Sequence, residues 1–261
     1  MIKKTIFALT LVSMGLSHVG EVSATGTVPP PDNRGLSLII EYQTTPPNRP
    51  MLRQELTQST VQTFAKWEHD GRLTHYKLLF SRYADSGNWD AMAILTFATP
   101  ASLYRWRRVE ARDPGALSTK ALAAVTTIRT TPADLKFSAA TAARLPDAVY
   151  VVIPYKTEVS ASDYLKYANA YVIPQFKGWM GEGVLASYAI YMNQFPAGRA
   201  WNVIAILRYK DQAALSRREA VVDKVRARLK SNPEWEAISV SKQHVRAEEQ
   251  VVVADPVVLG H

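Results

Sequence analysis

The chain overlaps itself when it is shifted by 112 residues. An ungapped comparison of residues 64–109 with residues 176–221 matches thirteen positions, among them two tryptophan pairs, Trp67/Trp179 and Trp89/Trp201. Ordinary composition would give roughly three matches over such a stretch. The sequence therefore predicts two copies of one α+β unit, and we expect any functional site to lie between them.

The first 24 residues have the features of a signal peptide. Lys3 and Lys4 precede the apolar run Thr5–Leu16, and Val22–Ala24 is a small-residue cleavage site. The run is too short to span a bilayer, and no later segment is long enough. We expect a mature protein that starts near Thr25 and is periplasmic or secreted. The alternative is an uncleaved anchor.

Composition excludes several kinds of site. The chain has no Cys, so it can form no disulfide, thiolate metal site or iron–sulfur cluster, and stability must come from a buried core. Its net charge is +8. For an exported protein we expect no nucleic-acid partner. A net positive charge would instead favour peripheral contact with an anionic surface of the cell envelope. The alternative is an ordinary solvated basic face.

The predicted organisation is a Pro-rich lead-in at residues 25–35, a first unit with its connector at 36–145, and a second unit at 146–261. Each unit is expected to run strand, helix, strand, hairpin, strand, helix. In the first unit these elements are predicted at Leu36–Tyr42, Arg49–His69, Leu73–Tyr83, Trp89–Phe97 and a helix opened by Thr99 and Pro100. In the second they are predicted at Ala148–Tyr155, Asp163–Met180, Leu185–Phe195, Trp201–Tyr209 and a helix from Asp211 to about Lys230.

The fourth strand of each unit is less distinct in the sequence. In the connector, Ala116–Thr130 has a helical pattern and Leu135–Ala143 is the predicted short strand. In the second unit, Asn232 and Pro233 are expected to stop the last helix, and a strand near Ile238–Val253 is expected to close the unit.

The third strands predict how the units pack. In the first unit, alternate residues from Trp89 to Phe97 are apolar, and Met92 and Ile94 make the opposite face apolar as well. A strand that is apolar on both faces is covered on both. Helices can cover one face, so we expect the other face to meet the sheet of the sister unit.

This pattern resembles the dimeric α+β barrel superfamily of ferredoxin-like units, typified by antibiotic-biosynthesis monooxygenases. The resemblance rests on the two β-α-β-β-α-β units and on residues 89–106, WDAMAILTFATPASLYRW, a third strand that runs into a capped helix. It implies an α+β fold in which tandem ferredoxin-like repeats form an intramolecular dimeric α+β barrel with pseudo-two-fold symmetry. Members include cofactor-free oxygenases, haem-degrading enzymes, cyclases, isomerases, dehalogenating enzymes and proteins with no assigned activity.

The resemblance allows one test of cofactor use. Haem-degrading members carry an iron-ligating His on the helix after the third strand. Here that helix contains Tyr104–Arg112 in the first unit and Leu215–Lys230 in the second, and neither has a His. A haem role is therefore disfavoured, and we expect no cofactor. We also expect no metal site, because the scarce histidines show no converging ligand pattern.

One polar group is a candidate for acid–base chemistry. Glu41, His75 and Asp90 are the predicted catalytic residues, since a carboxylate desolvated beside a protonatable side chain can act as a general base. Lys77 is predicted to bind ligand beside them. The alternative is that Lys77 and Asp90 occupy solvated edge or turn positions.

A second group is aromatic with polar tips. Rings suit a flat apolar ligand, while hydroxyl and amide groups orient it. The predicted ligand-binding members are Trp89, Tyr155, Tyr188, Tyr191, Asn193 and Trp201. The alternative is a Tyr-rich core and helix interface.

Three functional hypotheses follow. The first is a module that binds a small apolar or aromatic molecule between the two sheets. The second is a cofactor-independent monooxygenase or isomerase that acts on an aromatic, polyketide-like substrate in the same cavity. The third is a non-catalytic envelope interaction protein with a filled barrel. The sequence gives neither the ligand nor the oligomeric state.

Overall fold

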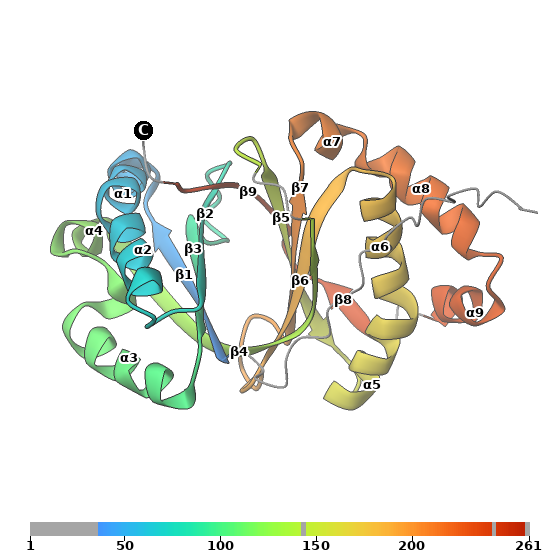
Figure 1. Ribbon diagram of the computed structural model, residues 1–261, viewed down its shortest axis with the longest axis horizontal. Coiled ribbons are helices and arrows are strands. Elements are labelled where there is room, and N and C mark those ends of the chain that lie inside the picture. Colours follow the sequence, from blue (N-terminus) through green and yellow to red (C-terminus); the bar gives the residue numbers. More distant parts are fainter. Residues whose placement is uncertain (1–35, 142–144, 242–243, 259–261) are drawn as a thin grey trace, which may run out of the picture.

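The computed structural model describes residues 36–141, 145–241 and 244–258. The predicted signal peptide and the lead-in at residues 25–35 lie outside these ranges. Within them, strands form one antiparallel sheet that curls into a ring, with helices on both outer sides (Figure 1). No helix of the described part has the length and apolar character needed to cross a membrane.

The first half of the chain supplies the elements on one side of the ring. Its helical segments include a π-helical stretch at Leu56–Thr60 and 3₁₀ turns at Pro46–Asn48 and Pro114–Ala116. In chain order the strands and α-helices are β1 (Leu36–Thr44), α1 (Arg49–Glu55), α2 (Val61–His69), β2 (His75–Ser81), β3 (Ala91–Phe97), α3 (Pro100–Arg112), α4 (Thr119–Ala124) and β4 (Val125–Ala140).

The second half supplies the other side. A π-helical stretch at Ala168–Val172 again interrupts its first helical segment. In order the elements are β5 (Val149–Thr157), α5 (Ala161–Tyr167), α6 (Ile173–Gly181), β6 (Leu185–Asn193), β7 (Val203–Tyr209), α7 (Gln212–Ser216), α8 (Arg218–Leu229), α9 (Pro233–Ser241), β8 (Arg246–Glu248) and β9 (Val252–Pro256).

Eight of these strands close the ring in the order β4-β1-β3-β2-β9-β5-β7-β6, and β6 pairs back onto β4. Two strands join the halves: in Figure 1, β4 crosses at the bottom and β9 at the top. Arg82, which follows β2, donates through Nη2 to Oδ1 of Asp255 in β9 at 2.5 Å. The short strand β8 pairs beside β9 on β5 and lies outside the ring.

Three apolar clusters correspond to the layers of the molecule. One lies between the first-half strands and α1–α4, and includes Leu38, Phe64 and Leu95. Another lies between the second-half strands and α5–α9. The third fills the interior of the ring with side chains from both halves: Ile39, Leu79, Trp89, Met92, Ile94, Ala133, Ala148, Tyr150, Val152, Tyr191, Trp201, Ile204, Ile206, Val252 and Ala254. Strands of the two halves thus face each other across the interior as expected, but they belong to one closed sheet and not to two separate sheets.

The local signals for helix ends are confirmed where the structure describes them. Thr99 accepts a hydrogen bond from Ser102 N at 3.1 Å, with Pro100 in the first turn of α3. Asp211 caps α7 by accepting from Ala214 N. Gly71, at φ 67°, follows α2 in the left-handed conformation that ends many helices.

Two predictions about the fourth strands are wrong. The helix predicted over Ala116–Thr130 ends at Ala124, and β4 already begins at Val125 because the β-branched run from Val125 to Ile128 favours strand. The strand predicted near Ile238–Val253 is replaced by α9 followed by β8 and β9. Asn232 accepts hydrogen bonds from Glu234 N and Trp235 N, so Asn232 and Pro233 start a helix as well as stopping one.

Candidate functional site

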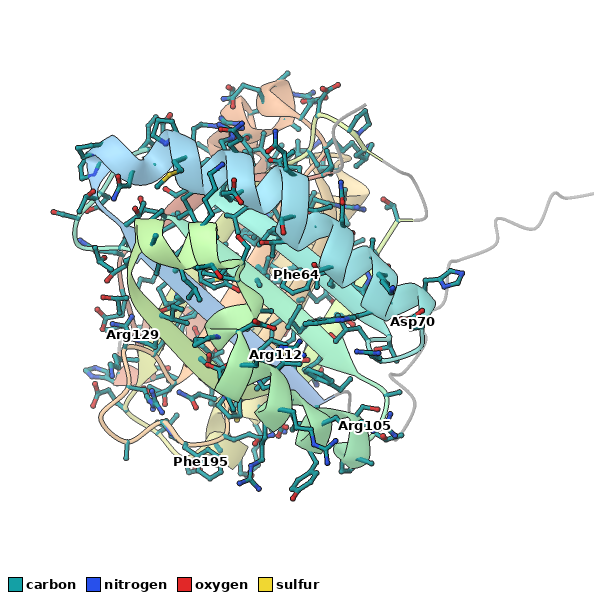
Figure 2. All side chains as sticks on the ribbon, turned by 90° about the vertical axis from the view of Figure 1, so that its left-hand side faces the viewer. Phe64, Asp70, Arg105, Arg112, Arg129 and Phe195 are labelled. Atoms are coloured by element: carbon teal, nitrogen blue, oxygen red, sulfur yellow. The ribbon has the colours of Figure 1, made fainter. Side chains whose placement is uncertain are left out.

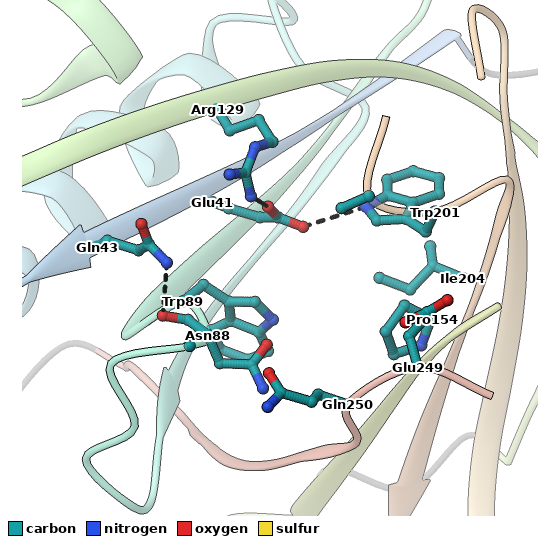
Figure 3. Close-up of a pocket in the computed structure, with 12 residues that line it drawn as sticks. Glu41, Gln43, Asn88, Trp89, Arg129, Pro154, Trp201, Ile204, Glu249 and Gln250 are labelled. Carbon is teal, nitrogen blue, oxygen red and sulfur yellow. Dashed lines mark hydrogen bonds and ion pairs between the residues drawn. The ribbon is translucent and has the colours of Figure 1, made fainter. Parts of the chain in front are cut away.

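A pocket of about 260 Å³ lies between the two halves, at the end of the ring where β1 ends and β3 and β7 begin (Figure 3). We call it the mouth pocket. Both halves and the segment between β8 and β9 contribute to its wall. Its lining residues are Glu41, Gln43, Gly87, Asn88, Trp89, Arg129, Pro154, Ala200, Trp201, Ile204, Glu249 and Gln250.

Glu41 is the most buried charged group of the mouth pocket, with 6% of the residue exposed. Its strand position gives it the same face as Ile39, which belongs to the interior cluster. Arg129 stands directly opposite on β4 and donates from Nη1 to Oε2 of Glu41 at 2.8 Å. Trp201, from the second half, donates its indole Nε1–H to Oε1 at 3.1 Å. The carboxylate is therefore held by one donor from each half of the molecule.

Trp89 lies across the mouth pocket from Trp201, and both indoles are buried (Figure 3). Trp89 follows the hairpin turn of the first half, in which Gly87 N donates to Oδ1 of Asp85 at 2.9 Å. Gln43 fastens this turn to β1, because its Nε2 donates to the carbonyl oxygen of Asn88 at 2.9 Å. The turn and the end of β1 thus hold Trp89 at the pocket.

The polar groups of the mouth pocket suit a ligand with a polar edge. Each carboxylate oxygen has two acceptor positions, and each oxygen of Glu41 receives one hydrogen bond from the residues drawn in Figure 3. The side chains of Gln43, Asn88 and Gln250 add amide donors and acceptors around the opening. A flat molecule between the indoles could therefore be oriented from one edge.

The predicted catalytic residues do not come together. Asp90 accepts a hydrogen bond from Thr44 N at 2.7 Å and forms an ion pair with Arg49, which ties β1 to the start of α1. Glu41 on β1, Met92 on β3 and Leu79 on β2 pair side by side across the sheet. His75 lies four residues before Leu79 on β2, so it is about 13 Å along the strand from this row. Glu41 alone of the three lines the pocket.

His75 and Lys77 lie toward the other end of β2. Nδ1 of His75 is 3.3 Å from Oε1 of Glu68, and the side chain is 56% exposed, yet its partial desolvation, followed by the charge of Lys77, lowers the pKa of His75. Burial and then the nearby charge of Arg208 lower the pKa of Lys77 to about 8. Nε of Arg208 is buried and has no hydrogen-bond partner within the described part of the chain. This end of the ring therefore concentrates positive charge.

The predicted aromatic set is divided between two layers. Trp89 and Trp201 line the mouth pocket, and Tyr191 lies in the interior cluster, where burial raises the pKa of its hydroxyl. Tyr155 and Tyr188 face the helices instead. Strand alternation could have shown this separation, because Tyr188 and Tyr191 are three residues apart and must point to opposite faces.

Asn193 has a supporting position. Its Nδ2 donates to the carbonyl oxygen of Trp201 at 3.1 Å, and its Oδ1 accepts from Phe195 N at 2.9 Å. It therefore shapes the hairpin that carries Trp201, and it does not line the mouth pocket.

Several lining residues were missed by the sequence reasoning. Arg129 was hidden by the helix predicted over Ala116–Thr130, although the β-branched residues that begin at Val125 were the available signal. Glu249 and Gln250 fell inside a predicted strand and lie in the irregular segment between β8 and β9. No sequence pattern marks Asn88 as a pocket residue, since turn asparagines are common.

The candidate ligands for a metal or a haem iron lie as follows. In residues 36–141, 145–241 and 244–258, no group of three or more His, Asp or Glu side chains could hold a metal ion. Helices α3, α7 and α8 carry no His, so the iron ligand that the resemblance implies is missing from these positions.

Comparisons with known proteins show the fold. No protein-family model matches the sequence, and no curated protein matches it. A solved structure from Lactobacillus acidophilus NCFM, provisionally assigned as a monooxygenase, has a TM-score of 0.55 at 13% identity and covers 86% of this chain and 95% of its own. A second, similarly assigned, from Fusobacterium nucleatum subsp. nucleatum, has a TM-score of 0.55 at 10% identity and covers 87% and 94%. An anthrone oxidase-like protein has a TM-score of 0.53 at 13% identity and covers 87% and 92%.

These likenesses extend over nearly the full length of both chains. Together with the closed ring of eight antiparallel strands they give an α+β protein of the dimeric α+β barrel type. At such identities the likeness is one of fold, and activity does not follow from it.

Proposed function

We propose that this protein binds a small aromatic or apolar molecule with a polar edge in the mouth pocket. The observation that carries the proposal is the placement of Trp89 and Trp201, one from each half, on either side of a space that also contains a buried carboxylate. An engineered apolar cavity of about 150 Å³ holds benzene. A pocket of about 260 Å³ is larger and therefore suits a ligand of up to three fused rings.

The arrangement assigns complementary roles to the two kinds of wall. The indoles offer flat apolar surface, which favours rings through stacking and burial. Glu41 suits a ligand hydroxyl or N–H, because an ionised carboxylate only accepts hydrogen bonds. Arg129 offers donors to a ligand carbonyl. We infer a neutral ligand with both kinds of group, such as a phenolic ketone.

A second candidate function is cofactor-independent oxygenation or isomerisation in the same pocket. It is favoured by Glu41, a carboxylate that can accept a proton from an activated ring or methylene carbon. For a methylene group conjugated with a phenolic ketone through an aromatic ring, loss of the proton gives a carbanion that molecular oxygen can oxidise. Conversion of CH₂ to C=O releases four electrons, which one O₂ takes up as the new carbonyl oxygen and one water. The likeness of fold to an anthrone oxidase-like protein is compatible with this chemistry.

The third hypothesis, a non-catalytic envelope protein, has less support from the pocket. Large apolar side chains fill much of the ring interior, as that hypothesis requires. A filled barrel would not explain the polar groups that converge at the mouth pocket.

We also propose that the protein is exported and that its halves arose by internal duplication. Export rests on the leader pattern of residues 1–24. Duplication is supported by elements at the sequence offset of 112: β3 and β7, and the π-helical stretches at Leu56–Thr60 and Ala168–Val172.

Native mass spectrometry of protein purified from its exported compartment tests the binding proposal by looking for a co-purifying small molecule. Isothermal titration with 2-naphthol and with 1,8-dihydroxyanthrone adds a defined probe. We expect Glu41→Gln to weaken binding about tenfold, through loss of a hydrogen bond to a charged group. Glu55→Gln is the matched control, since Glu55 is also a buried carboxylate but pairs with Lys120 outside the pocket.

A clean apo mass together with no heat from either probe would reject binding. Oxygen uptake with 1,8-dihydroxyanthrone separates the second candidate from the first. Uptake that is lost in Glu41→Gln and kept in Glu55→Gln would favour the enzyme, whereas binding without uptake would favour the binding module.

A further inference from the structure

A second pocket, of about 310 Å³, lies on the outer face of the first half, between the end of α2 and α3. We call it the arginine groove. Figure 2 views this face, with Arg105 and Arg112 on α3 and Asp70 at the end of α2. Arg72, Arg105, Arg108 and Arg112 line it together with Ser102 and the apolar residues Trp67, Leu73, Phe97, Trp106 and Val109.

Aromatic rings make the apolar wall of the arginine groove. The ring of Trp106 meets that of Trp67 edge-on with centroids 6.0 Å apart, and that of Phe97 at 6.0 Å. The indole Nε1–H of Trp106 donates to Oε2 of Glu110 at 3.0 Å. Because its polar edge is already satisfied, Trp106 presents the groove with apolar ring surface.

The arginines of the groove carry more charge than their surroundings neutralise. Arg112 pairs with Asp113 at 2.7 Å. Across the described ranges, Arg72, Arg105 and Arg108 form no ion pair with a carboxylate. Four guanidinium groups around one apolar pocket repel one another, and an anion placed among them would relieve that repulsion.

The second half gives an internal contrast. There α8 packs directly on α6: an added Cβ at Gly178 would lie 2.4 Å from Cγ1 of Val225. The basic side chains Lys224 and Arg228 at this contact are both paired with one carboxylate, that of Glu182, at 2.7 and 3.3 Å. In one half this region is thus filled and its paired cations share a carboxylate, whereas in the other half it is an open groove lined by four arginines.

We propose that the arginine groove binds an apolar molecule that carries a carboxylate. Guanidinium groups match a carboxylate through paired N–H donors, and arginine also stacks on flat rings. The apolar wall would hold a ring system or alkyl chain, and the rim would hold the charged head. This site is separate from the mouth pocket, which lies between the halves and contains a buried carboxylate that would repel such an anion.

Isothermal titration of the full chain with 2-naphthoate tests the proposal. Arg105→Gln combined with Arg108→Gln should weaken binding by about tenfold or more, because charge-assisted hydrogen bonds are lost. Arg107→Gln is the matched control. Arg107 lies on the same helix but stacks over Tyr104 outside the groove, at 5.3 Å from the ring centroid, so its loss should leave binding unchanged.

Two further ligands test separately the contributions of the carboxylate and of the aromatic ring to binding. The neutral 2-naphthamide should bind at least about tenfold more weakly than 2-naphthoate, since it cannot pair with the guanidinium groups. Inorganic phosphate should not displace 2-naphthoate at matched ionic strength, because it gains nothing from the aromatic wall. Equal binding of the amide, displacement by phosphate, or no loss in the double variant would overturn the proposal. Binding lost in Glu41→Gln and kept in the double variant would also overturn it, by moving the ligand to the mouth pocket.

Discussion

At the scale of single residues, the group with the largest consequence is Glu41. A buried carboxylate is costly unless donors satisfy it, and here the donors come from Arg129 on β4 and Trp201 on the opposite side of the ring. The same hydrogen bonds that make the carboxylate tolerable also fix its position in the mouth pocket. A change at either donor should therefore alter both stability and ligand binding.

Substitution of Trp201 by Phe should destabilise the protein by about 1–3 kcal/mol, because Oε1 of Glu41 loses its indole donor while it stays buried. Urea unfolding of Trp201→Phe, Glu41→Gln and the double variant measures the coupling between the two residues. We expect the double variant to be more stable than the sum of the single losses predicts. The same cycle with Glu55→Gln should be additive, and additivity in the Glu41 cycle would mean that the hydrogen bond between Trp201 and Glu41 contributes nothing to stability.

Lys77 predicts a pH dependence of stability. The pKa of Lys77 in the folded chain is about 8, below the ordinary value of 10.5, because the half-buried ammonium loses solvation and lies near the charge of Arg208, with Glu68 opposing this in part. Between these pH values the unfolded chain binds more protons than the folded chain, so stability should rise with pH through this window. Below pH 8, where Lys77 is protonated in the folded chain too, its charge destabilises the folded protein to the full extent.

Lys77→Met should therefore stabilise the protein at pH 7 by about 1–3 kcal/mol, and should flatten the rise in stability above pH 8. Urea unfolding at pH 6, 7, 8, 9 and 10 measures both effects. Lys66→Met, at an exposed position of α2, is the control and should change neither. If the Lys77 variant kept the full pH dependence of stability, this dependence would have to come from another titratable group.

At the scale of elements, the π-helical stretches show what a local rule can and cannot explain. Pro174 lies at the start of α6, and a proline is expected to kink or shorten a helix, since it has no N–H to donate and crowds the preceding turn. The chain instead widens at Ala168–Val172 and continues as α6. The first half widens in the same way at Leu56–Thr60, a segment that no proline follows closely, so proline is not the common cause.

The helix contact in the second half can be tested at one glycine. Gly178→Ala places a Cβ against Val225, so α6 and α8 must move apart, and we expect a loss of about 1–3 kcal/mol. Gly181→Ala is the matched control on the same helix, because nothing lies within 4 Å of its added Cβ. The control should be neutral or stabilised by up to about 1 kcal/mol, since alanine favours helix over glycine. Thermal unfolding compares the two, and equal effects would contradict the close contact.

Elements with a strong period or a clear cap could be predicted from the sequence. The third strands and their capped helices gave both the layer order and two residues of the mouth pocket, Trp89 and Trp201. The strand predicted at Leu135–Ala143 matches the end of β4 within the described residues. The first part of β4 could not be predicted, because the helical pattern of Ala116–Thr130 continued past the point where β-branched residues take over. The candidate site was incomplete for the same reason. Arg129 reaches Glu41 by cross-strand pairing, which depends on a register that one sequence does not contain.

At the scale of the whole molecule, the ring makes the two halves depend on each other. β4 begins beside β1 and ends beside β6, and β9 lies between β2 and β5. The interior cluster also draws its side chains from both halves. Neither half on its own would retain both neighbours of its strands or a covered inner face.

We therefore expect one cooperative unfolding transition for the full chain. The fragments 36–145 and 146–261 should each lack a cooperative transition when expressed alone, because each exposes an apolar sheet face and unpaired strand edges. Calorimetry of the full chain, and of both fragments alone and mixed, measures this. Two resolved transitions, or a fragment that melts cooperatively as a monomer, would show that the halves are independent.

The ring is closed unevenly. β4 pairs along the whole of β1 from Leu36 to Thr44, whereas β9 pairs with β2 along Leu79–Ser81 within the described residues. Local unfolding should therefore begin at the short pairing between β2 and β9. Native-state hydrogen exchange should find the amides of β9 less protected than those of β4. Transient release of this C-terminal strand would also widen the entrance of the mouth pocket, because Glu249 and Gln250 of the pocket wall lie in the segment that leads into β9.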